Sequence, residues 1–93
     1  MDWTIEWSER SLKDLQSLEK QVRNRVYSYL DVISKLPNPR LRGRSLTGNL
    51  DEYWRYRIGD YRVICDIQDN RLIVLILQVG HRRDIYKRRS LMR

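Results

Sequence analysis

Apolar and polar residues alternate over residues 2–7, which puts Trp3, Ile5 and Trp7 on one face and predicts a β-strand. From Ser8 onward the apolar residues recur every three or four positions as far as Ile33, which is a helical period. One straight helix over 9–36 would be about 42 Å long, too long for a compact chain of this size. The pattern therefore predicts a helical hairpin that bends near residues 17–20.

Pro37-Asn38-Pro39 ends the helical pattern and opens a basic loop over 37–50. Alternation then returns and predicts strands at 52–58, 61–68 and 71–79. Gly59-Asp60, with glycine first, is typical of a type II′ hairpin turn, and Asp69-Asn70 predicts a second tight turn. The strongly basic residues 81–93 are expected to form a short helix or a frayed end.

This order of elements predicts an α+β fold of the form β-α-α-β-β-β, in one domain spanning residues 1–93. The helical hairpin should pack on one face of an antiparallel sheet. The strand at 52–58 is expected to run antiparallel to the first strand.

A turn at Gly59-Asp60 decides which residues of the hairpin share a face, because directly opposed residues do so. The face expected to pack on the helices holds Trp54, Tyr56, Ile58, Tyr61, Val63, Cys65 and Ile67. The opposite face holds Tyr53, Arg55, Arg57, Arg62, Ile64 and Asp66. Like charges at opposed positions destabilise a sheet, so the arginines point to a bound anion. The alternative is that Asp66, Glu52 or the C-terminal residues neutralise them.

The net charge of +7 is unevenly distributed along the 93 residues. Residues 1–36 hold six basic and six acidic residues, whereas residues 37–93 hold 13 basic and six acidic ones. Arginine outnumbers lysine 15 to four, and its planar fork suits bidentate contact with phosphate. The excess indicates a polyanion or an acidic protein as the partner.

Several classes of protein are not indicated. No apolar run approaches the roughly 18 residues of a membrane span, and the N-terminus lacks the layout of a signal peptide. The single cysteine, Cys65, excludes an internal disulfide and is expected to be a buried, inert thiol. His81 is the only histidine, so no multi-histidine metal site and no cofactor is expected. These features predict a cytoplasmic protein.

The stretches "LTGNLDEYWRYRIGDYRVICDI" and "LQVGHRRDIY" resemble the RelE branch of the RelE/ParE toxin superfamily. The resemblance covers residues 46–86 and implies a toxin of a type II toxin–antitoxin system. RelE-like members are endoribonucleases that cleave mRNA in the ribosomal A site. Their partner is an antitoxin, here a RelB-like one, that wraps the toxin and masks its basic face.

The resemblance also implies roles for single residues. Arg62 and Arg82 match arginines that hold the scissile phosphate, and Tyr86 matches a tyrosine implicated in proton transfer and base stacking. Arg55 stands where the best-studied branch has a catalytic lysine. Tyr53 replaces another lysine of that branch, which is a departure from the family pattern.

Further contacts are expected around this centre. The residues expected to contact RNA phosphates are Arg57, Arg42, Arg44, His81 and Arg83. Alternation places Ile64, Leu75 and Leu77 on the side of Arg62, and the open sheet face should carry an exposed Ile64, Leu75 or Leu77 in a patch that the antitoxin covers.

The chemistry implied is metal-independent attack of the RNA 2′-hydroxyl on the adjacent phosphorus, helped by cations and by acid–base catalysis. Arginine is a poor base because it stays protonated, so Tyr86, His81 or a ribosomal group would have to accept the proton. Two alternatives stay open. One is a ParE-like inhibitor of DNA gyrase, and the other is an inactive module that binds RNA or antitoxin.

Overall fold

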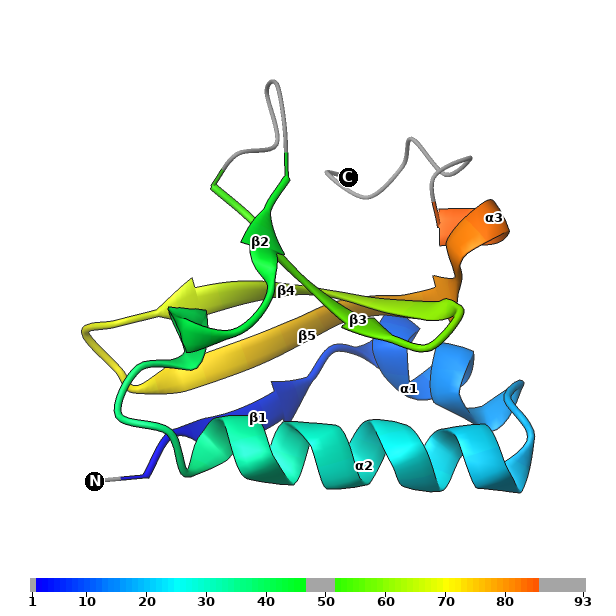
Figure 1. The fold of residues 1–93 in the computed structure, drawn as a ribbon, viewed down its shortest axis with the longest axis horizontal. Coiled ribbons are helices and arrows are strands. Elements are labelled where there is room, and N and C mark those ends of the chain that lie inside the picture. Colours follow the sequence, from blue (N-terminus) through cyan, green and yellow to red (C-terminus); the bar gives the residue numbers. More distant parts are fainter. Residues whose placement is uncertain (1, 47–51, 86–93) are drawn as a thin grey trace.

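The computed structural model describes residues 2–46 and 52–85. Its elements in chain order are β1 (Thr4–Trp7), α1 (Glu9–Gln16), α2 (Lys20–Ser34), a 3₁₀ helix η1 (Pro39–Leu41), β2 (Arg44–Ser45), β3 (Trp54–Ile58), β4 (Tyr61–Gln68), β5 (Ile73–His81) and α3 (Arg82–Ile85). The strands form one sheet in the order β1-β5-β4-β3-β2, with α1 and α2 on one side of it (Figure 1). The predicted α+β class and the helical hairpin are confirmed. Within this part of the chain, no helix has the length and apolar character needed to cross a membrane.

The sheet is mixed, so the prediction of a fully antiparallel sheet is wrong in one respect. β1 lies parallel to β5, while β5, β4, β3 and β2 pair antiparallel in succession. The cause is the path of α2, which returns the chain to the start of β1, where the Trp3 N–H donates to the Ser34 carbonyl at 2.8 Å. β3 runs in the same direction as β1, contrary to the expectation that the strand at 52–58 would run antiparallel to it.

The helical hairpin begins and bends where the sequence indicates. The Ser8 hydroxyl accepts a hydrogen bond from the Ser11 N–H and caps α1. The backbone N–H of Ser17 closes the last turn, and α2 starts after Glu19. Within α2, Val26, Leu30 and Ile33 are buried at the spacing of one helix face.

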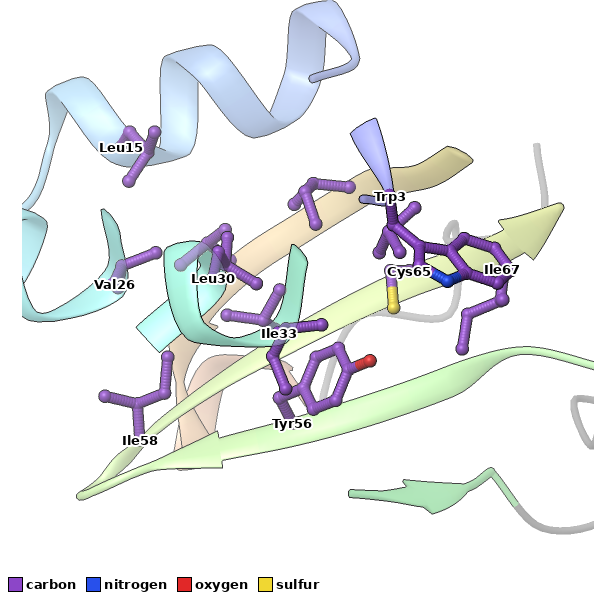
Figure 2. Close-up of a cluster of buried hydrophobic side chains, with 13 residues drawn as sticks. Trp3, Leu15, Val26, Leu30, Ile33, Tyr56, Ile58, Cys65 and Ile67 are labelled. Atoms are coloured by element: carbon purple, nitrogen blue, oxygen red, sulfur yellow. The ribbon is translucent and has the colours of Figure 1, made fainter. Parts of the chain in front are cut away.

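The core lies between α2 and the helix-facing side of the sheet. Figure 2 shows Leu30 and Ile33 above the ring of Tyr56, with Cys65 beside Trp3 and Ile67. Burying each large apolar side chain contributes roughly 1.5–3 kcal/mol, so this layer supplies most of the stability. Burial also raises the pKa of the Cys65 thiol, and the nearby Asp66 adds to the shift. The expected burial of Cys65 is confirmed.

The register of the β3–β4 hairpin matches the prediction pair by pair. Ile58 faces Tyr61, Arg57 faces Arg62, and Arg55 faces Ile64. Gly59 has a φ of 60°, as the first central residue of a type II′ turn requires.

The start of β5 differs from the prediction by two residues. The turn after β4 uses four residues rather than two, and Leu72 has a φ of 54°. The Thr4 N–H donates to the Leu72 carbonyl at 2.8 Å, so β1 holds Leu72 in this conformation. The ladder of β5 therefore starts at Ile73.

An irregularity in the β4–β5 ladder attaches α1 to the sheet. The register shifts between Ile64 and Cys65, as at a β-bulge. The Asp14 carboxylate on α1 accepts a hydrogen bond from the Val79 N–H at 3.0 Å, and the Ser8 N–H donates to the Ile76 carbonyl at 3.0 Å. Groups left by the irregular ladder thus hold the short helix in place.

The basic loop expected over 37–50 contains two short elements that the sequence pattern did not indicate, η1 and β2. Side chains of β3 hold this segment from the sheet side. The Tyr56 hydroxyl donates to the Pro39 carbonyl, and the Trp54 indole N–H donates to the Arg42 carbonyl, both at 2.7 Å. Gly43 has a φ of 84°, and a Cβ there would collide with the Arg55 carbonyl oxygen. Residues 39–43 are therefore fastened against β3.

Candidate functional site

The strand register brings the predicted arginines together on the sheet face that points away from α2. We call this the open face. Arg57, Arg62 and Gly80 lie side by side on β3, β4 and β5, in one row across the sheet. The row therefore carries two guanidinium groups next to a glycine.

A second row lies beside the first and adds two more arginines. It crosses four strands and consists of Arg44, Arg55, Ile64 and Gln78. Arg44 lies directly opposite Arg55, so both rows hold like charges at opposed positions, an arrangement that destabilises a sheet unless an anion compensates it. The pairing of Arg44 with Arg55 depends on β2, which the sequence pattern did not reveal.

Arg62 is the most deeply placed arginine of the open face, with 6% of its surface exposed. Its Nη1 donates to the carbonyl oxygens of Gly59 and Tyr61 at 2.9 and 3.0 Å. No carboxylate of the described residues pairs with Arg62 or Arg57. Two turn carbonyls thus fix the guanidinium in one orientation without neutralising its charge, which is the preparation that an anion site needs.

The expected alternative, neutralisation of the arginines by acids of the same hairpin, finds no support at Asp66. The Asp66 carboxylate accepts a hydrogen bond from the Gln68 side chain at 3.2 Å. By contrast, Arg40 lies away from these rows and forms a two-pronged pair with Asp69 at 2.8 and 2.9 Å.

Helix α3 brings two further predicted residues to the same end of the sheet. The Arg82 N–H donates to the Asp60 carbonyl at 2.8 Å, which joins α3 to the β3–β4 turn. Ile85 is buried and lies over Gly80, where an added Cβ would be 3.4 Å from its Cδ1. Arg82 and Arg83 are both exposed, on the helix that follows directly after the strand of Gly80.

His81 lies at the junction of β5 and α3. Its Nδ1 accepts a hydrogen bond from the Arg83 N–H at 3.2 Å, and its ring meets the Tyr61 ring edge-on at 5.5 Å. With Nδ1 acting as an acceptor, the proton of the neutral imidazole resides on Nε2. The imidazole is half-buried, and because His81 pairs with Tyr61 it lies on the face of Tyr61, opposite to the face that carries Arg62.

Two tyrosines, Tyr53 and Tyr86, were singled out in the sequence. Tyr86 lies outside the described residues, whereas Tyr53 is described. Burial raises the pKa of the Tyr53 phenol, and the charges of Glu52 and Asp66 raise it further. Tyr53 therefore keeps its proton near neutral pH and does not replace the charge of the family lysine.

The predicted apolar patch for the antitoxin is only partly present. Ile64 is 3% exposed, so the expectation that it is a surface residue is wrong. It lies on the central strand β4 between the long side chains of Arg55 and Gln78, which flank it from both sides. Leu75 and Leu77 are half-buried.

Gln78 is a feature of the open face that sequence reasoning missed. It is 1% exposed and lies next to Ile64 in the second row. The available signal was a polar residue within the apolar strand at 72–79, opposite Arg55 across β4.

Comparisons with known proteins agree with this architecture. A model of the family described as ParE toxin of type II toxin–antitoxin system, parDE, matches residues 5–86. Toxin RelG of Mycobacterium tuberculosis is 32% identical over 89 residues, which is 95% of this chain and 100% of that protein.

Solved structures of RelE-type complexes share the fold. The toxin–antitoxin complex RelBE2 of M. tuberculosis matches with a TM-score of 0.79 and 26% identity, over 87% of this chain and 92% of that one. The archaeal RelE–RelB complex from Pyrococcus horikoshii OT3 matches with a TM-score of 0.69 and 31% identity, over 88% and 97% of the two chains. The chain therefore belongs to the ParE toxin family and is a RelE-like toxin of a type II toxin–antitoxin system.

Proposed function

We propose that this toxin is a ribosome-dependent endoribonuclease that cleaves mRNA without a metal ion. The observation that carries the proposal is Arg62, a nearly buried guanidinium that two turn carbonyls orient and no described carboxylate neutralises. Arg57 lies opposite it, and Arg82 lies on the adjoining helix. These three arginines form a cationic site suited to binding one phosphate group.

The reaction proposed is an internal transesterification of RNA. The 2′-oxygen attacks the adjacent phosphorus, the bond from phosphorus to the 5′-oxygen breaks, and the products are a 2′,3′-cyclic phosphate and a 5′-hydroxyl. Negative charge grows on the phosphate oxygens in the transition state. Arg62 and Arg82 would bind these oxygens, and Arg55 and Arg57 would add positive charge at close range.

Proton transfer is the weaker part of this chemistry. Arginine does not accept a proton near neutral pH, so the 2′-hydroxyl must pass its proton to another group. His81 is one candidate from this chain, in the row next to that of Arg62 and held by the Arg83 N–H. Tyr86 is the other candidate from this chain, on the resemblance alone. A site with strong charge stabilisation and few bases would depend on the ribosome to orient the RNA.

An antitoxin would cover the open face when the toxin is held inactive. The RelBE2 and archaeal RelE–RelB structures are complexes of that kind. An acidic segment would neutralise Arg57 and Arg62, and its apolar residues would pack on Leu75 and Leu77, which are half-buried. Activity on translating ribosomes would place the toxin in the cytoplasm.

A second candidate function is inhibition of DNA gyrase, which the ParE description of the matching family model favours. One experiment separates the two. The toxin is induced briefly, and mRNA 5′ ends are mapped against the reading frame while plasmid supercoiling is followed in the same cells. Cleavage at a fixed codon position with normal supercoiling supports the nuclease, whereas intact mRNA with altered supercoiling replaces it with the gyrase inhibitor.

A further inference from the structure

A basic cleft lies between α2 and β3. It consists of two adjoining cavities of about 550 and 320 Å³, which share Tyr29 and Arg57 in their walls. We call it the α2–β3 cleft. Among the described residues, five arginines line the two cavities, namely Arg25, Arg42, Arg44, Arg55 and Arg57, and no acidic side chain does.

The walls of the cleft are held by interactions already described for the fold. Trp54 and Tyr56 fasten the loop that carries Arg42, through hydrogen bonds of 2.7 Å. On the other wall, the Arg25 guanidinium lies over Gly59, where an added Cβ would be 2.8 Å from its Nη2. The β3–β4 turn needs a glycine for its φ of 60°, and the guanidinium of Arg25 occupies the space beside it.

Three arginines of the cleft, Arg25, Arg42 and Arg57, have no carboxylate partner among the residues that the structure describes. In residues 2–46 and 52–85, neither Arg25 nor Arg57 forms an ion pair, and Arg42 contacts only the face of the Tyr29 ring, 5.8 Å from its centroid. Cations held this close together without a counter-charge are stabilised by a bound polyanion.

The cleft continues from the open face around the edge of the sheet. Among the described residues β2 pairs with β3 only at Trp54 and Arg55, so no strand pairs with β3 at Arg57, which is exposed. Arg57 lies at that edge, faces Arg62 across the ladder and also lines both cavities. A polyanionic chain bound at Arg62 can therefore continue past Arg57 into the cleft.

The composition of the walls favours nucleic acid over protein as the occupant. The buried centres of protein–protein interfaces are depleted of charged residues, whereas interfaces with nucleic acids are polar and strongly positive. Asn24 and Ser28 on the α2 wall add hydrogen-bonding groups for phosphate and sugar oxygens.

We propose that the α2–β3 cleft binds the sugar–phosphate backbone of RNA outside the scissile site, with Arg25 and Arg42 as positioning residues. This inference rests on the proposed function, because RNA is the polyanion it invokes. The contacts are to phosphate, so binding should depend on salt and little on sequence. The proposal gives α2 a role in RNA binding that extends beyond its packing in the core.

The test measures binding of the full-length toxin to a 12-nucleotide oligouridylate with 2′-O-methyl groups, over a series of salt concentrations. This probe has no 2′-hydroxyl and cannot be cleaved, so binding is read without ribosomes or catalysis. Arg25→Gln and Arg42→Gln should each weaken binding severalfold and reduce the slope of log affinity against log salt by about 0.7. Arg25→Lys keeps the charge and should restore most of the slope.

Arg71→Gln is the matched control, because Arg71 is exposed on the β4–β5 turn and donates only to the Gln68 side chain, at 3.3 Å. It should leave the slope unchanged. An unchanged slope in Arg25→Gln and Arg42→Gln, or no binding of the probe by the parent protein, would overturn the proposal. The proposal would also be overturned if Arg25→Gln and Arg42→Gln bound the RNA probe like the parent protein but bound an acidic antitoxin peptide more weakly. The mapping of mRNA 5′ ends tests the proposed nuclease activity separately, so its failure can be told apart from failure of the RNA-binding proposal.

Discussion

The two faces of the sheet are formed by alternate residues of the same strands, yet one face belongs to the buried apolar core and the other carries arginines. Tyr56 and Val63 face each other across β3 and β4 and are fully buried beneath α2. One position further along, Arg57 faces Arg62 on the other side. Alternation assigns each residue to one face of the sheet. The helical hairpin packs on one of the two faces and excludes water from it.

The difference shows where stability and function reside in this fold. Each large side chain buried on the helix-covered face contributes roughly 1.5–3 kcal/mol, whereas a like-charge pair on the open face costs roughly 0.2–1 kcal/mol. The core can therefore sustain two rows of arginines that weaken the sheet. Substitutions on the two faces should separate accordingly into effects on folding and effects on cleavage.

The largest effect is expected on the covered face. Leu30→Ala removes a side chain that is 2% exposed and should lower the free energy of unfolding by about 2–5 kcal/mol. Urea denaturation followed by circular dichroism measures the change. Leu12→Ala is the matched control, because Leu12 is 44% exposed on α1 and its loss should cost less than about 0.5 kcal/mol. Equal losses in both variants would mean that α2 does not form the core layer described here.

The next effect belongs to the open face and concerns rate rather than folding. Arg62→Ala removes the oriented guanidinium and should slow single-turnover mRNA cleavage on ribosomes by ~10²–10³, as loss of one transition-state donor does. The free energy of unfolding should change by no more than about 1 kcal/mol, because two hydrogen bonds are lost while a charge facing Arg57 is removed. Arg71→Ala, which changes the charge equally, should cleave like the parent. Parental cleavage by a folded Arg62→Ala protein would remove the proposed site.

A smaller effect should distinguish charge from shape on the same face. Arg55→Lys keeps a positive charge opposite Arg44 but loses the planar fork, so cleavage should fall only a few-fold, whereas Arg55→Gln should fall further. Both rates come from the same ribosome assay. Equal loss in the two variants would show that the fork of Arg55, and not its charge, is what the reaction uses.

Much of the covered face could be predicted because its signals are local. Alternation in β3 and β4, with Gly59-Asp60 between them, determines the register that the structure shows. The helix start at Ser8 is equally local, because its hydroxyl caps the first turn of α1.

The features that escaped prediction depend on contacts between distant segments. β1 pairs parallel to β5 because the end of α2 is tied to Trp3, and no pattern within either strand encodes that tie. The burial of Ile64 follows from its place between Arg55 and Gln78, and the cleft position of Arg25 follows from the packing of α2 beside the β3–β4 turn. Alternation assigns a face but does not reveal what covers it.

The smallest effect is expected at Arg40, which forms an ion pair with Asp69, in contrast to Arg57 and Arg62. The Arg40 guanidinium lowers the pKa of Asp69 through a two-pronged hydrogen bond, so Asp69 binds its proton less readily in the folded chain than in the unfolded one. The pair therefore stabilises the fold above the unfolded pKa of about 3.9 and loses that contribution as the pH falls through the lower folded pKa. Both side chains are well exposed, so Asp69→Asn should cost at most about 1 kcal/mol of unfolding free energy at pH 7, and this cost should vanish in acid. Urea denaturation at the two pH values measures it, with Asp31→Asn as the control, because the Asp31–Lys35 contact is a single one at 3.2 Å on the surface of α2. A cost that grew toward low pH would mean that Asp69 is stabilised in its protonated form, opposite to the direction that its contact with Arg40 requires.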